Sequence, residues 1–128
     1  MTVQEAIVAA ESILPGDAVP DGETDSRWQA IIAIGDFIEA EPEAVWSFVV
    51  RWGASPDEDL RAAIATCLLE HLLEHHFDVF MPRVERASLT DRIFGHMVCQ
   101  CWKFGQAENR ERSQRFDRLI ASIRHHGS

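Results

Sequence analysis

The sequence predicts an all-α domain built from pairs of helices, and three observations lead to that prediction. Apolar residues recur at helical spacing in one segment after another, and no segment alternates with period two for long enough to form a strand. Stretches rich in proline and glycine separate several of these segments. A shift of 34 residues superimposes one amphipathic segment on another. At 128 residues, the chain is expected to form one domain, residues 1–128, whose core needs no metal or disulfide.

Capping residues, together with the prolines and glycines between helices, predict where the first three helices begin and end. Thr2 begins T-V-Q-E, a capping box, so a helix is expected over residues 3–14. Residues 15–23 contain two prolines and two glycines and are expected to form a loop. A second helix is predicted over residues 25–40, and a third, opened by a proline and ended by a glycine, over residues 42–52.

Residues 55–76 are predicted to form the central helix of the domain. Ser55 is expected to cap it, and Glu58 completes a capping box three residues later. Histidines near its end suit the negative pole of the helix dipole. Its apolar residues cover a wide surface, which requires neighbours on more than one side: Leu60, Ile64, Ala65, Leu68, Leu69, Leu72 and Leu73.

Two further helices are expected after the central one. A fifth is predicted over residues 79–87, capped by Asp78, and a sixth is predicted to start at Thr90 or Asp91 and to end at Gly105. The apolar residues expected to face the core from the sixth helix are Ile93, Phe94, Met97, Val98, Cys101 and Trp102.

The last predicted helix begins at Asn109, which is expected to cap it. Residues 125–128 are expected to form a frayed tail. The residues of this helix expected to be buried among arginines are Phe116, Leu119, Ile120 and Ile123.

The internal similarity lies between the second and fourth helices. The segments DSRWQAIIAIGDFI and DEDLRAAIATCLLEHL resemble the second helix of HEAT repeats, D-x-x-x-R-x-A-A-x-A-L-x-x-L, and PEAVWSFVVRWG is similar to the short helix that pairs with it. The resemblance covers about residues 25–104. It implies a right-handed α–α superhelix of HEAT-like helix pairs, with about seven helices, that binds proteins and has neither catalytic residues nor a cofactor.

Charge is unevenly distributed along the chain. The net charge is −9, made up of −13 in residues 1–80 and +4 in residues 81–128. The acidic part would repel a nucleic acid, so a basic protein is the partner we expect. The sequence contains no apolar run of membrane-spanning length, and its first residues carry acid where a signal peptide needs basic residues. We therefore expect a cytoplasmic protein that contacts no membrane.

Several of these acidic side chains are expected to lie together on one exposed face. If the second and fourth helices stand side by side, their outer faces form one surface, which we call the acidic ridge. A solvated surface is the alternative, but such surfaces usually mix charges of both signs, and lysine occurs only once in the chain. The ridge residues expected to bind protein are Asp25, Gln29, Asp36, Asp59, Thr66, Glu70 and Glu74.

Three functions stay open on this basis. The first is a non-enzymatic module that holds a basic protein; small acidic immunity proteins that neutralise a basic toxin have this charge and size. The second is a metal-binding or metallopeptidase-like protein, because His71, Glu74 and His75 spell H-x-x-E-H. A charged helix end explains the same residues without metal. The third is a structural adaptor that uses Trp46, Trp52 and Phe80.

The cysteines indicate no redox or metal site. The chain has an odd number of cysteines, and all three lie within helical patterns: Cys67, Cys99 and Cys101. This favours reduced thiols. Residues two apart on a helix point about 200° from each other, so Cys99 and Cys101 are not expected to share one ion.

Overall fold

The computed structural model describes residues 1–14 and 25–126, so the loop predicted over residues 15–23 lies outside the described residues. Its regular elements there are all helical, and that part of the chain contains no strand, as the sequence predicts. The elements are α1 (Val3–Ile13), α2 (Ser26–Gly35), α3 (Pro42–Trp52), α4 (Glu58–Ile64), the π-helix η1 (Ala65–Leu69), α5 (Glu70–Thr90), α6 (Arg92–Val98), the 3₁₀ helix η2 (Gly105–Glu108) and α7 (Arg110–His126).

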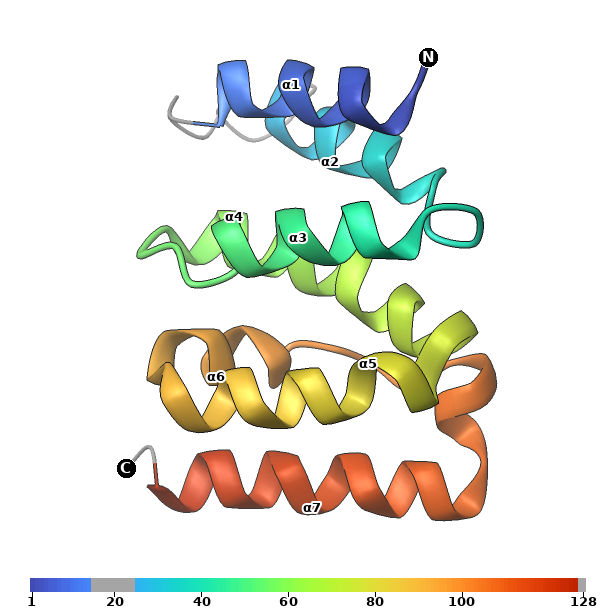
Figure 1. Ribbon diagram of the computed structural model, residues 1–128. Helices are drawn as coiled ribbons and strands as arrows, with labels where there is room; N and C mark the ends of the chain where they lie inside the picture. Colours follow the sequence, from blue (N-terminus) through green and yellow to red (C-terminus); the bar gives the residue numbers. More distant parts are fainter. Residues whose placement is uncertain (15–24, 127–128) are drawn as a thin grey trace.

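The helices lie in layers that follow the order of the chain. Helix α1 packs on α2, α3 on α4, and α5 on α6, and α7 covers the last layer. Figure 1 shows α1, α3, α5 and α7 stacked on the near side, with α2 and α4 behind them. The helices α1 and α7 therefore form the two ends of the stack.

The segment from α4 to the first turns of α5 lies at the centre of the core, as predicted. It contacts α2, α3 and α6, so neighbours surround it on several sides. Each of its predicted apolar residues is at most 3% exposed: Leu60, Ile64, Ala65, Leu68, Leu69, Leu72 and Leu73.

The predicted cap of this segment is wrong. Asp57, not Ser55, caps α4: its Oδ1 accepts hydrogen bonds from the backbone N–H groups of Asp59 at 3.0 Å and Leu60 at 3.3 Å. The Ser55 hydroxyl accepts the N–H of Asp57 at 3.1 Å, which makes a turn before the helix. The helix therefore begins three residues after Ser55, at Glu58.

The central segment is also not one regular α-helix. Residues 65–69 form a π turn, and the backbone at His76 leaves helical geometry, with φ −140° and ψ 47°. The π turn lies against α2 at Gly35, where a Cβ atom would come within 3.2 Å of the Cys67 carbonyl oxygen. A glycine there allows the two helices to approach closely.

Asp78 does not cap the fifth helix. The helix α5 resumes directly after the kink at His76 and continues to Thr90. The backbone N–H of Phe77 is accepted by the side chain of Gln106 at 2.9 Å, while Asp78 makes an ion pair with Arg112 at 2.9 Å. The side chain of Gln106, distant in sequence, thus satisfies a backbone N–H next to the kink.

Two predicted helices end early. The second ends at Gly35 rather than at Ala40, and residues 36–38 donate to carbonyls three residues back, which tightens the chain into turns. The sixth helix, capped by Asp91 as expected, ends at Val98 instead of Gly105. Trp102 therefore lies outside the helix and is exposed, contrary to its predicted place in the core.

The two ends of the stack follow the sequence more closely. Thr2 and Glu5 form the predicted capping box on α1. Asn109 accepts the N–H groups of Glu111 and Arg112, so it caps α7 as predicted. Phe116 is buried in α7, and the helix continues to His126, into the predicted frayed tail.

Candidate functional site

A groove lies between α2 and the segment formed by η1 and the start of α5. Its volume is about 390 Å³. Its charged lining residues are Asp36 and Glu39, with no lysine or arginine beside them. The lining residues are Ile32, Gly35, Asp36, Ile38, Glu39, Thr66, Cys67, His71 and His75. We call it the acidic groove.

The acidic groove contains only part of the predicted acidic ridge. Asp36 and Thr66 line it, and Glu74 lies at its edge through a hydrogen bond with His71, 2.7 Å between His71 Nδ1 and Glu74 Oε1. Glu39, which the sequence analysis did not single out, is a lining residue and is largely exposed. The turns that end α2 early bring Glu39 to the groove, and no sequence pattern signals them.

Glu70 was expected on the exposed ridge, but it is buried. Only 5% of the residue is exposed, and its Oε1 accepts the backbone N–H of Trp102 at 3.0 Å. Burial raises the pKa of the Glu70 carboxyl, and the hydrogen bond from Trp102 opposes that rise. Its role is therefore to hold the chain around Trp102, and it is not available to a partner.

Three other ridge residues lie at the N-terminal ends of α2 and α4. Asp25 caps α2, and Asp59 accepts hydrogen bonds from Arg27 at 2.8 Å and from the indole of Trp28 at 3.0 Å. Gln29 is exposed on the first turns of α2. None of the three lines the groove, and the contacts of Asp25 and Asp59 stabilise helix ends and the packing between layers.

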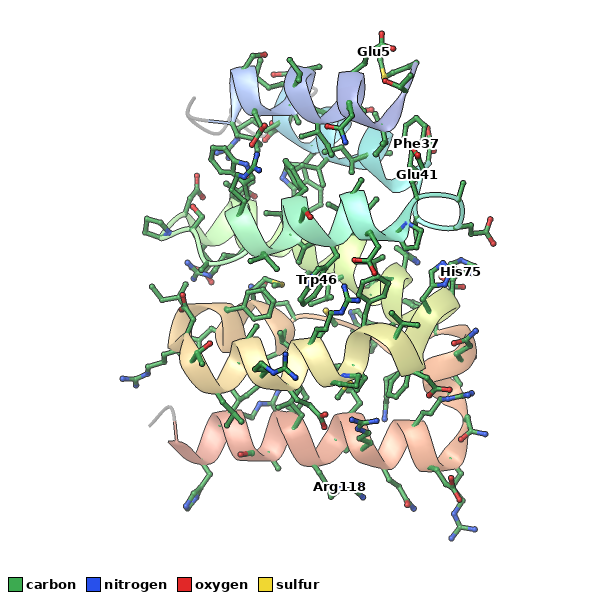
Figure 2. All side chains as sticks on the ribbon, in the orientation of Figure 1. Glu5, Phe37, Glu41, Trp46, His75 and Arg118 are labelled. Carbon is green, nitrogen blue, oxygen red and sulfur yellow. The ribbon has the colours of Figure 1, made fainter. Side chains whose placement is uncertain are left out.

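The histidines of the H-x-x-E-H segment make hydrogen bonds and ion pairs with nearby carboxylates. His75 Nδ1 lies 3.3 Å from Glu39 Oε1, and His75 Nε2 lies 3.6 Å from Glu74 Oε1. Figure 2 shows His75 at the same edge of the molecule as Glu41. Among the described residues, no group of three or more histidine, cysteine or acidic side chains is arranged to hold a metal ion.

The residues of the predicted adaptor surface, Trp46, Trp52 and Phe80, are buried to different extents. Phe80 is fully buried, and Trp46 packs on it with ring centroids 5.6 Å apart, between α3 and α5 in Figure 2. The indole N–H of Trp52 donates to Glu11 at 2.9 Å. Phe80 is therefore not available to a partner, whereas Trp46 and Trp52 are half-buried.

The segment from Cys99 to Phe104 crosses from α6 to η2, and we call it the strap. Its Trp102 is 72% exposed and its Phe104 is 39% exposed. The Phe104 ring stacks on His71, with centroids 5.8 Å apart and planes at 14°. Sequence reasoning assigned Trp102 to packing, because it continues the apolar spacing of α6.

Two of the three cysteines, Cys99 and Cys101, lie in the strap. Cys67, Cys99 and Cys101 are all free thiols. Cys101 donates to the carbonyl of Ala65 at 3.5 Å, and burial raises its pKa well above the usual value. These contacts make Cys101 an anchor of the strap on η1.

A second groove, of about 450 Å³, lies between α5 and α7. Its arginines already pair with carboxylates: Arg112 lies 2.9 Å from Asp78, and Arg115 lies 2.6 Å from Glu85. Arg118 lines it as well and projects from the outer side of α7 in Figure 2. Because both signs of charge meet here, this groove presents a weaker net field than the acidic groove.

Similarity to known proteins does not identify a function. No protein-family model, curated protein or solved structure matches the chain. Among the helices of the described residues, none combines the length and the apolar character needed to cross a membrane.

Proposed function

We propose that this chain is a non-enzymatic protein-binding module whose acidic groove holds a basic protein. The observation that carries the proposal is the groove lining, in which Asp36 and Glu39 are the carboxylates and no lysine or arginine is present; His75 Nδ1 lies 3.3 Å from Glu39 Oε1. A groove of one sign attracts a surface of the other and orients it before contact. Ile32, which is 46% exposed, adds apolar area at the same place.

The charge of the whole chain supports a basic partner. The first 80 residues carry −13, and the remaining residues carry +4. A basic protein that approaches the α2 side would be drawn by this field and turned away from α7. Small acidic helical proteins that neutralise a basic toxin, as immunity proteins do, are the class that this charge and size fit best. The free thiols suit the reducing cytoplasm, where we place the protein.

We also propose that the layers form a right-handed, HEAT-like superhelix. Two pairs of residues related by the 34-residue shift support this: Ile31 and Ala65, and Ile34 and Leu68, are all fully buried. Equivalent positions of the two units thus face the same core. In such an arrangement, the second helices line a common surface, and the acidic groove lies between two of them.

The side chains in the groove favour binding over catalysis. Burial raises the pKa of the Cys67 thiol, which disfavours the thiolate that a nucleophile requires. His71 is hydrogen-bonded to Glu74 at 2.7 Å, which fixes its ring. Carboxylates and an exposed aliphatic side chain around an open groove recognise a cationic surface without a reaction.

The test compares two variants that remove equal charge. Asp36→Asn combined with Glu39→Gln neutralises the groove, and Glu41→Gln combined with Glu58→Gln neutralises exposed acids outside its lining. The probe is a short glycine–serine peptide carrying several arginines, titrated at low and physiological salt. We expect the groove variant to bind about tenfold more weakly and with a flatter salt dependence, and the control to change far less. Equal losses in the two variants, or no binding to the wild type, would overturn the proposal.

A further inference from the structure

The strap places a large aromatic surface in solvent on a fixed backbone. The backbone N–H of Trp102 donates to the buried Glu70, and the thiol of Cys101 donates to Ala65. Gly105 directly follows the strap, and its φ of +52° suits glycine and turns the chain into η2. With the backbone on both sides of Trp102 held in this way, its 72% exposure is a property of the fold. A backbone fixed in place before binding loses little entropy when a partner covers the side chain.

The strap adjoins the acidic groove through Phe104. Phe104 stacks on His71, and His71 is also a lining residue of the acidic groove, so the two surfaces are continuous. Glu74 lies against the end of the strap, since a Cβ atom at Gly105 would come within 2.7 Å of Glu74 Cγ. The strap therefore carries the exposed Trp102 beside the acidic groove, and the ammonium of Lys103 is turned to Ser113 and Asp117 of α7.

We infer that Trp102 receives an arginine side chain of the basic partner. This inference rests on the proposed function and names the contact at the centre of that interface. A guanidinium is planar and weakly hydrated, so it stacks well on an aromatic face, and its charge is favoured by the adjoining acidic groove. An ammonium group stacks less well, and an apolar side chain gains nothing from the charge of the groove. Exposed tryptophans that pair with arginine are frequent centres of binding energy.

The test uses three glycine–serine peptides of equal length that carry arginine, lysine or citrulline. Citrulline keeps the shape of arginine without its charge. Three proteins are titrated with each peptide: the wild type, Trp102→Leu, which removes the ring, and Trp102→Phe, which keeps one. The exposed position of Trp102 makes both variants compatible with the fold, and their melting temperatures check this.

We expect the wild type to bind the arginine peptide about threefold more tightly than the lysine peptide, and the citrulline peptide most weakly. Trp102→Leu should bind arginine and lysine peptides equally and keep the salt dependence, while Trp102→Phe keeps part of the preference. An unchanged preference in Trp102→Leu, or no preference in the wild type, would overturn this inference and leave the proposed function standing. Failure of both cationic peptides to bind the wild type would remove the proposed function and this inference with it.

Discussion

The guanidinium of Arg27 in α2 lies 2.8 Å from the carboxylate of Asp59 in α4, measured from Nη2 to Oδ2. Arg27 is only 3% exposed, and its Nη1 lies 2.7 Å from Asp57, the cap of α4. The hydrogen bond from Arg27 lowers the pKa of Asp57. One buried cation thus ties the start of one layer to the start of the next, and Asp59 is part of this contact.

Replacement of Arg27 by methionine should destabilise the fold. The variant keeps most of the side-chain volume but leaves Asp57 and Asp59 without their buried partner. Because both carboxylates are more than one-third exposed and regain water, we expect a loss of about 2 kcal/mol in the free energy of unfolding, less than for a fully buried pair. Denaturant melts measure it. Glu43→Gln, which weakens the exposed pair with Arg83, is the control and should change stability far less than the Arg27 variant. Equal effects of the two variants would contradict the structural role of Arg27.

Leu68 is fully buried where η1 packs against α2. Leu68→Ala should lower the free energy of unfolding by about 2–5 kcal/mol, because it removes buried surface and leaves a cavity. Leu89→Ala is the matched control, since Leu89 is 77% exposed and its loss should cost less than about 0.5 kcal/mol. A small effect at Leu68 in the same urea melts would show that the central segment is misplaced.

Glu70→Gln gives a pH-dependent result. Because burial raises the Glu70 pKa, the carboxylate destabilises the folded state once the pH exceeds its folded pKa, and this cost is absent below its ordinary pKa. Glutamine keeps an oxygen to accept the Trp102 N–H without the charge. We therefore expect the variant to be more stable than the wild type near about pH 7, with the difference shrinking towards about pH 4. Urea melts at the two pH values measure this. A variant less stable than the wild type at the higher pH would mean that the charge itself holds the strap.

The starts of several helices could be predicted from the sequence because they depend on residues close together in the chain. The capping residues Thr2, Asp91 and Asn109 act on N–H groups within three residues of themselves, so their positions can be derived from the chain alone. The burial of Leu68 and Leu72 follows from their spacing. Pairs such as Arg27 with Asp59 arise only when the layers pack, and no local pattern marks them.

The candidate site was harder to predict because of the π turn. The acidic ridge assumed regular α-helical spacing from Asp59 to Glu74, but residues 65–69 form a wider turn. Glu70 directly follows this wider turn and is buried, whereas regular α-helical spacing predicts it on the exposed face. The outward position of Trp102 depends in turn on its hydrogen bond to that buried carboxylate.

Mapping the binding face by NMR tests the central claim most directly. The ¹⁵N-labelled protein is titrated with the arginine peptide, and shifts of backbone and indole N–H signals are followed. The account predicts the largest shifts at Asp36 and Glu39, at Thr66 to His75, and at the indole of Trp102, with little change along α7. Shifts concentrated on α7 or on the near side of α3 would contradict it, because those surfaces contain neither the acidic groove nor the strap.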